Sequence, residues 1–118
     1  MIRLDNVTKI YKGETRAVDG VTLNIEKGEF IFLVGESGSG KSTMLRLFTA
    51  EEPATEGQVH VAGKDLSRIS SWRVPYLRRN IGSVFQDFKL LPQKTVYENV
   101  AFALEVIGRP RNIITNQV

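Results

Sequence analysis

The chain has 118 residues, 42% of them hydrophobic and 25% charged, which is typical of a globular domain and excludes a disordered or fibrous chain. Lys and Arg exceed Asp and Glu by 16 to 13, a surplus too small to indicate a nucleic-acid partner. No cysteine is present, so disulfides and thiolate metal sites are excluded.

The first predicted elements are strands. Apolar and polar residues alternate over residues 2–10 and 17–25, which predicts two half-buried antiparallel strands joined by a turn at 13–15. The apolar run FIFLV at 30–34 predicts a short strand that is buried on both faces. Apolar residues at helical spacing predict a helix over 41–50.

Further elements follow in the second half. We expect a strand at 58–63, a short basic helix at 72–79 that Pro75 interrupts, and a strand at 81–85. Thr95 and Glu98 form a capping-box pattern, which predicts a helix ended by Gly108 and Pro110. Its expected apolar face consists of Val96, Val100, Ala103, Leu104 and Ile107. Residues 111–118 show no strong periodicity.

The sequence GESGSGKST at 35–43 fits the phosphate-loop pattern G-x-x-x-x-G-K-[ST] between a predicted strand and a predicted helix. Its glycines would let successive backbone N–H groups point at phosphate oxygens, and Lys41 would bind the terminal phosphates. Ser42 would bind Mg²⁺ and Thr43 a phosphate oxygen. The expected nucleotide-binding residues are Gly35, Glu36, Ser37, Gly38, Ser39, Gly40, Lys41, Ser42 and Thr43. The alternative is a glycine-rich turn without a ligand, and the missing third glycine excludes a dinucleotide fingerprint.

With this loop, a β-rich segment and Gln86 after an apolar run, the chain resembles the first half of an ABC ATPase domain over nearly its whole length. The resemblance implies an α/β P-loop NTPase fold, with a core sheet and an N-terminal antiparallel β subdomain. VFQDFKLLPQKTVYENVAFALEVIG most resembles the cell-division subfamily, whose members act with an integral membrane partner of the FtsX type. The ATPases of lipoprotein release and macrolide export share much of this pattern and remain alternatives.

The resemblance also implies roles for single residues. Tyr11 would stack on adenine, with Arg16 and Val18 near the same base. Gln86 would bind Mg²⁺ and the attacking water, so that Lys41 and Gln86 are the expected catalytic residues and Ser42 and Gln86 the metal ligands. The loop after Gln86 would contact the membrane subunit through Phe88, Leu90 and Leu91, although either leucine could instead pack in its own domain.

The family resemblance implies ATP and Mg²⁺ as cofactors, a homodimer of complete subunits, and a peripheral place on the cytoplasmic face of the cell membrane. It implies no nucleic-acid partner, and the small charge surplus argues against a DNA-maintenance ATPase. A non-hydrolysing nucleotide-binding scaffold is the other alternative.

Parts of the family pattern are missing from these residues. The signature, the Walker B strand with its acidic pair and the switch histidine are absent, and none of Asp5, Asp19, Asp65 and Asp87 follows four apolar residues. We therefore expect an N-terminal half of the domain that binds nucleotide without turnover, is poorly stable and self-associates through an unpaired sheet edge.

Three weaker features remain. Arg73, Arg78 and Arg79 would form a solvated helix face, with contact to anionic lipid as the alternative. Trp72 is expected to pack in the core. His60 lacks a second histidine, so a metal site there is not expected.

Overall fold

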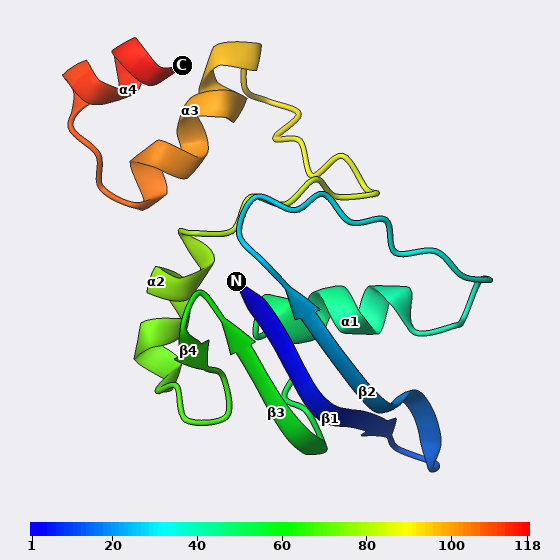
Figure 1. The fold of residues 1–118 in the computed structure, drawn as a ribbon. Coiled ribbons are helices and arrows are strands. Elements are labelled where there is room, and N and C mark those ends of the chain that lie inside the picture. The colour runs from blue at the N-terminus through cyan, green and yellow to red at the C-terminus, as the bar shows by residue number, and fades with distance from the viewer. The chain divides into compact units, whose positions relative to one another are not determined.

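The computed structural model describes residues 1–118. The chain divides into two compact units, Met1–Gly82 and Ser83–Val118 (Figure 1). None of its helices has the length and apolar character needed to cross a bilayer.

The first unit is built on a four-stranded antiparallel sheet with the strand order β2-β1-β3-β4. Its strands are β1 (Ile2–Tyr11), β2 (Thr15–Ile25), β3 (Glu56–Val61) and β4 (Lys64–Asp65). The strands predicted at 2–10, 17–25 and 58–63 are confirmed with small changes of their bounds. The third ends early because Ala62 and Gly63 have positive φ angles of 51° and 77° and turn the chain into β4.

The core of this unit lies between the sheet and two helices, α1 (Lys41–Phe48) and α2 (Val74–Arg78). Figure 1 shows α1 crossing one face of the sheet. Because alternate strand residues point to the same face, the sheet offers an apolar surface to the helices. The buried cluster consists of Leu4, Val7, Val18, Leu47, Val59, Val61 and Leu77. Burying each such side chain stabilises the fold by about 1.5–3 kcal/mol.

Two helices differ from their predictions in detail. The helix predicted at 41–50 ends at Phe48. Ala50 has a φ of 57°, a left-handed conformation that cannot be part of a right-handed α-helix. The guanidinium of Arg78 donates to the carbonyls of Thr49 at 2.9 Å and Ala50 at 3.4 Å, so it satisfies backbone groups just past the end of α1. The solvated interpretation of Arg78 is therefore incomplete.

The basic helix predicted at 72–79 is a 3-10 turn, η1 (Ser71–Arg73), followed by α2. Pro75 does not interrupt it, because the proline lies in the first turn of α2, where its missing N–H costs no helical hydrogen bond. The packing prediction for Trp72 is wrong. This side chain is 65% exposed and is covered on its face by the Arg73 guanidinium, 4.8 Å from the ring centre.

The strands predicted at 30–34 and 81–85 are also wrong. Neither segment joins the sheet, and the five side chains of 30–34 are between 42% and 83% exposed. An apolar run becomes a strand only when a neighbouring strand accepts and donates its backbone hydrogen bonds. In this structure neither segment is hydrogen-bonded to any of the four strands.

The second unit contains α3 (Val96–Val106) and α4 (Arg111–Gln117), which pack against each other. The capping box at the start of α3 is confirmed, as is its end before Gly108, which has a φ of 76°. The predicted apolar face is only partly correct, because Ala101 is the buried residue of α3 while Val96 and Val100 are exposed. The sequence did not indicate α4, whose Ile114 is buried.

Candidate nucleotide-binding site

The phosphate loop, residues 35–43, leads into α1 and its shape depends on glycine. Gly40 is the N-cap of α1 with a φ of 97°, and a Cβ there would lie 2.2 Å from the carbonyl oxygen of Ala17 on β2. Gly38 has a φ of 80°. The role of Gly35 is different from the one expected, since its φ is not positive and a Cβ would instead meet the Ser39 hydroxyl at 2.5 Å.

Lys41 is the first residue of α1, and its side chain turns back over the loop. Its Nζ donates to the carbonyl oxygens of Gly35 and Glu36, each at 2.6 Å, and to Oγ of Ser39 at 3.2 Å. No carboxylate pairs with this ammonium group. The loop therefore holds a positive charge that only neutral oxygens contact, as an anion-binding loop requires.

The start of α1 adds free backbone donors. No side chain caps the helix at Gly40, so the first N–H groups have no side-chain acceptor. The hydroxyl of Ser42 is on an exposed residue and is open to a ligand. Lys41, the helix N-terminus and these donors together suit a polyanion such as a nucleotide phosphate chain.

Thr43 and Tyr11 lie together. Thr43 is buried, and its Oγ1 is 3.3 Å from the hydroxyl oxygen of Tyr11 at the end of β1. This hydrogen bond ties the last residue of the first strand to the helix that follows the phosphate loop. The ammonium of Lys9 lies 5.3 Å from the centre of the Tyr11 ring. Whether adenine stacks on this half-buried ring stays a prediction.

The two residues expected near the same base differ in exposure. Arg16 is exposed and pairs with Asp19 at 3.1 Å. Val18 is only 5% exposed and belongs to the core cluster, so it offers almost no surface to a ligand. Its burial follows from the alternation of β2, in which Val18 points to the face that α1 covers.

Gln86 belongs to the second unit. The chain bends at Gln86 and Asp87, and both side chains are exposed. Its expected roles toward Mg²⁺ and water stay predictions. The loop that follows is held by Asn99 of α3, a residue that the sequence analysis missed.

The side-chain amide of Asn99 forms several hydrogen bonds with the backbone at the end of this loop. Its Oδ1 accepts from the N–H of Leu91 at 2.8 Å, while its Nδ2 donates to the carbonyl of Leu91 at 3.2 Å and to those of Lys94 and Thr95. Leu91 is partly buried, whereas Phe88 and Leu90 are exposed. The contact residues expected in this loop thus separate into one that packs and two that face outward. An asparagine eight residues after Leu91 gives no recognisable signal in the sequence.

Comparison with known proteins identifies the class. The family model described as ABC transporter matches residues 18–117, and the chain belongs to this family. A dimeric structure of the ATP-binding cassette MJ0796 bound to ADP and Pi superposes with a TM-score of 0.82 and 42% identity, covering 93% of this chain and 49% of that one. The backbone therefore has the fold of an ABC-type nucleotide-binding domain over the part that it spans.

Particular relatives carry the name Cell division ATP-binding protein FtsE. The chain is 55% identical to that of Mycobacterium tuberculosis, 48% to that of Bacillus subtilis and 43% to that of Escherichia coli K12. Each match covers 100% of this chain and 52%, 52% and 53% of the relative, respectively. The chain thus spans about half the length of these relatives. The resemblance to the cell-division subfamily that the sequence indicated is confirmed.

Proposed function

We propose that the chain forms the phosphate-binding part of an ATP-hydrolysing ABC subunit that acts as FtsE does in cell division. The observation that carries this proposal is the Lys41 ammonium, which is held over the phosphate loop by three neutral oxygens and has no carboxylate partner. The identity to FtsE proteins over the whole chain supports the cell-division assignment in preference to the lipoprotein-release or macrolide-export ATPases.

ATP and Mg²⁺ fit the residues of this loop. A Cβ at Gly40 would collide with the Ala17 carbonyl, so the close backbone turn depends on glycine, and Lys41 and the start of α1 supply the positive end. Gly35, Glu36, Ser37, Gly38 and Ser39 would surround the phosphates with backbone groups, Thr43 would bond a phosphate oxygen, and Ser42 would hold Mg²⁺. Mg-ATP would supply the phosphoanhydride bond that is cleaved.

For catalysis, Lys41 would stabilise charge on the transferred phosphoryl group, and Gln86 would position water and complete the Mg²⁺ site. We expect these 118 residues to bind Mg-ATP without turnover, because none of the four aspartates follows an apolar strand as a Walker B acid does. In the complete subunit, two copies would enclose the nucleotides, and the dimeric MJ0796 structures support that arrangement.

The loop after Gln86 would bind an integral membrane subunit of the FtsX type. Phe88 is 87% exposed and Leu90 is also exposed, while Asn99 holds the backbone of Leu91, the residue that follows them. A loop with outward apolar side chains suits a protein contact. The subunit would sit peripherally on the cytoplasmic face of the membrane, and nucleotide-driven motion would pass through this loop.

The nucleotide proposal is tested by titrating Mg-ATP while phosphate release is followed in the same sample. The variants are Lys41→Ala and, as a matched control, Lys27→Ala, because Lys27 is exposed and forms no ion pair. A charged hydrogen-bonding group is worth about 1.5–3 kcal/mol, so Lys41→Ala should bind roughly ten- to hundredfold more weakly. Equal binding by Lys41→Ala and the control, with unchanged circular dichroism, would contradict the proposal.

A further inference from the structure

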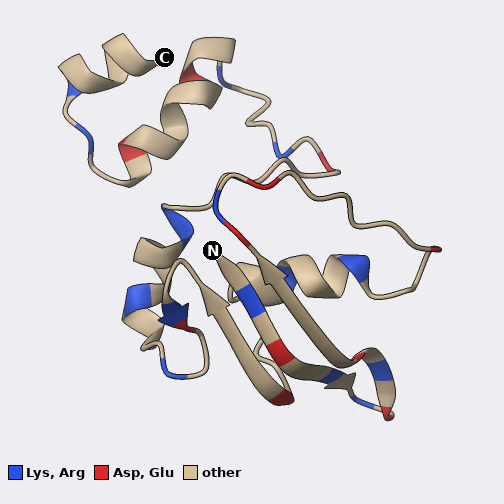
Figure 2. Ribbon diagram, viewed as in Figure 1, with Lys and Arg blue, Asp and Glu red and all other residues tan.

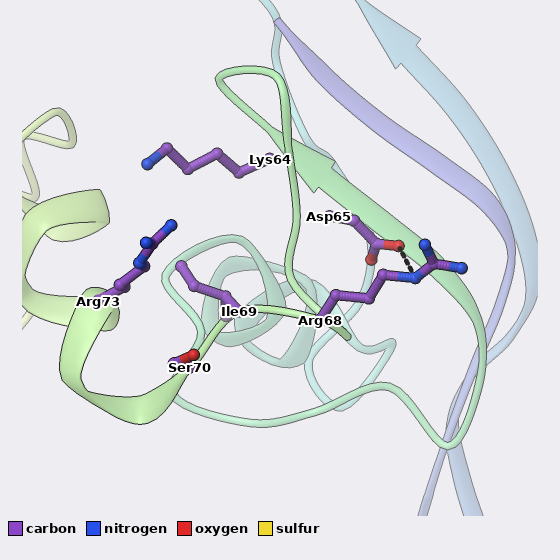
Figure 3. A pocket seen from close by; sticks show the side chains of 6 residues that line it. All are labelled: Lys64, Asp65, Arg68, Ile69, Ser70 and Arg73. Atoms are coloured by element: carbon purple, nitrogen blue, oxygen red, sulfur yellow. Dashed lines mark ion pairs between the residues drawn. The ribbon is translucent and has the colours of Figure 1, made fainter.

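A second site of interest lies in the first unit, among residues 64–73. A cavity of about 310 Å³ opens there, and none of its lining residues belongs to the phosphate loop. It is lined by Lys64, Asp65, Arg68, Ile69, Ser70 and Arg73 (Figure 3). The residues come from β4, the turn after it and η1, so they are close in sequence and fixed by short elements.

The cavity carries uncompensated positive charge. Arg68 pairs with Asp65 at 3.7 Å, and hydrogen bonds from the hydroxyl and the amide of Ser67 hold the pKa of Asp65 below its ordinary value, so this carboxylate is ionised at neutral pH. Lys64 and Arg73 form no ion pair. In Figure 3 their side chains extend to the same side of the cavity, while Arg68 is turned to Asp65 on the other side.

Exposed aromatic side chains adjoin these charges. Trp72 lies beside Arg73 in η1, and on α2 the exposed Tyr76 carries the guanidinium of Arg79 at 4.6 Å from its ring centre. Figure 2 shows that Lys and Arg occur repeatedly along β4 and the helical segment after it. Large amphipathic rings next to basic groups are the composition of surfaces that sit in the headgroup layer of a membrane.

We propose that residues 64–79 form a contact surface for anionic lipid, in which Lys64 and Arg73 bind a lipid phosphate at the cavity and Trp72 and Tyr76 enter the headgroup layer. Charge complementarity selects this occupant, because Lys64 and Arg73 have no carboxylate partner and line a cavity whose one carboxylate is already paired. The contact is additional to the membrane subunit proposed above and does not depend on it. It also gives Arg73 and Arg79 the lipid-facing role that the sequence left as an alternative.

Liposome flotation tests this surface, because aggregated protein sinks while vesicle-bound protein rises. The chain is mixed with vesicles of phosphatidylcholine alone or of phosphatidylcholine with phosphatidylglycerol. A basic residue near an anionic surface contributes about fivefold in affinity, so Lys64→Gln/Arg73→Gln should bind the anionic vesicles roughly ten- to thirtyfold more weakly. The matched control Lys27→Gln/Arg109→Gln removes the same charge from exposed positions outside the surface.

The proposal predicts that the chain binds anionic but not neutral vesicles and that high salt abolishes this binding. The control double variant should bind as the unchanged chain does, and Trp72→Ala should bind more weakly. Lys41→Ala should float as the unchanged chain does, which separates this surface from the nucleotide site. Equal flotation with both vesicles, or equal weakening by the two double variants, would overturn it. Release by low concentrations of inorganic phosphate would also overturn it, because that result would assign the cavity to a soluble phosphate compound.

Discussion

At the scale of single residues, Gly40 combines two constraints that the phosphate-loop pattern does not separate. Its φ of 97° is strained for any residue with a Cβ, and the Ala17 carbonyl occupies the space that a Cβ would need. The strain alone costs about 1–2 kcal/mol. The contact with Ala17 adds a displacement of the loop, so the geometry of the site depends on β2 as well as on the loop itself.

We predict that Gly40→Ala lowers both the free energy of unfolding and the affinity for Mg-ATP. Gly28→Ala is the matched control, because Gly28 also has a positive φ, 85°, but no atom lies within 4 Å of a Cβ built there. In the control, backbone strain should lower the free energy of unfolding by about 1–2 kcal/mol, and the affinity for Mg-ATP should not change. Denaturant unfolding and nucleotide titration of both variants check this, and equal nucleotide affinities would show that the Ala17 contact is unimportant.

The sequence predicts where the candidate site lies, but it does not predict the contacts that support it. The spacing of glycines, lysine and hydroxyls indicates residues 35–43 without reference to any other segment. The Ala17 carbonyl, the Tyr11–Thr43 hydrogen bond and the burial of Val18 all depend on how β1 and β2 meet α1. Such contacts between distant segments leave no periodic pattern in a single sequence.

At the scale of elements, the start of α3 rests on the reciprocal hydrogen bonds of its capping box. The hydroxyl of Thr95 accepts from the N–H of Glu98 at 3.1 Å, and the Thr95 N–H donates to the Glu98 carboxylate at 2.7 Å. The backbone hydrogen bond from Thr95, followed by the one with its side chain, holds the pKa of Glu98 below its ordinary value. The ionised carboxylate is therefore the form that the folded helix favours.

This shift predicts a pH dependence of α3. Because the folded pKa of Glu98 is lowered, its contribution is complete above the ordinary glutamate pKa of about 4.3 and is lost as pH falls through the folded value. Helix content followed by circular dichroism should decline in this range, and less so in Glu98→Gln. Thr95→Ala should destabilise the helix by about 1 kcal/mol and Thr95→Ser much less. An identical acid transition in Glu98→Gln and the unchanged chain would contradict the assignment.

Elements with clear local signals were predicted correctly, whereas two apolar runs that were predicted as strands form none. Alternation, caps and the glycine at 108 indicate β1, β2 and α3. The apolar runs at 30–34 and 81–85 have the composition of strands, but a strand exists only as part of a hydrogen-bonded ladder. Composition thus identifies a segment that could form a strand, and hydrogen bonding to a neighbouring strand decides whether the strand forms.

At the scale of the whole molecule, the exposed apolar run at 30–34 favours association between chains. It presents Phe30 and Phe32, whose rings meet edge to face at 5.0 Å, together with unpaired backbone groups. Such a segment can pair with a second chain. We predict concentration-dependent self-association in sedimentation velocity, reduced in Phe32→Lys and unchanged in the surface control Lys27→Gln. A cooperative melt of a monomer at all concentrations would show that this exposure has no consequence.

The central claim is that residues 35–43 bind the phosphates of Mg-ATP, and amide hydrogen exchange measured by mass spectrometry tests it most directly. Exchange is compared with and without Mg-ATP in the unchanged chain and in Lys41→Ala. The account predicts slower exchange in peptides covering 35–43 at a nucleotide concentration that just saturates the unchanged chain. At this concentration Lys41→Ala, which binds more weakly, should show little such change. Protection confined to other segments, such as 64–79, or equal protection of the loop in Lys41→Ala would contradict it.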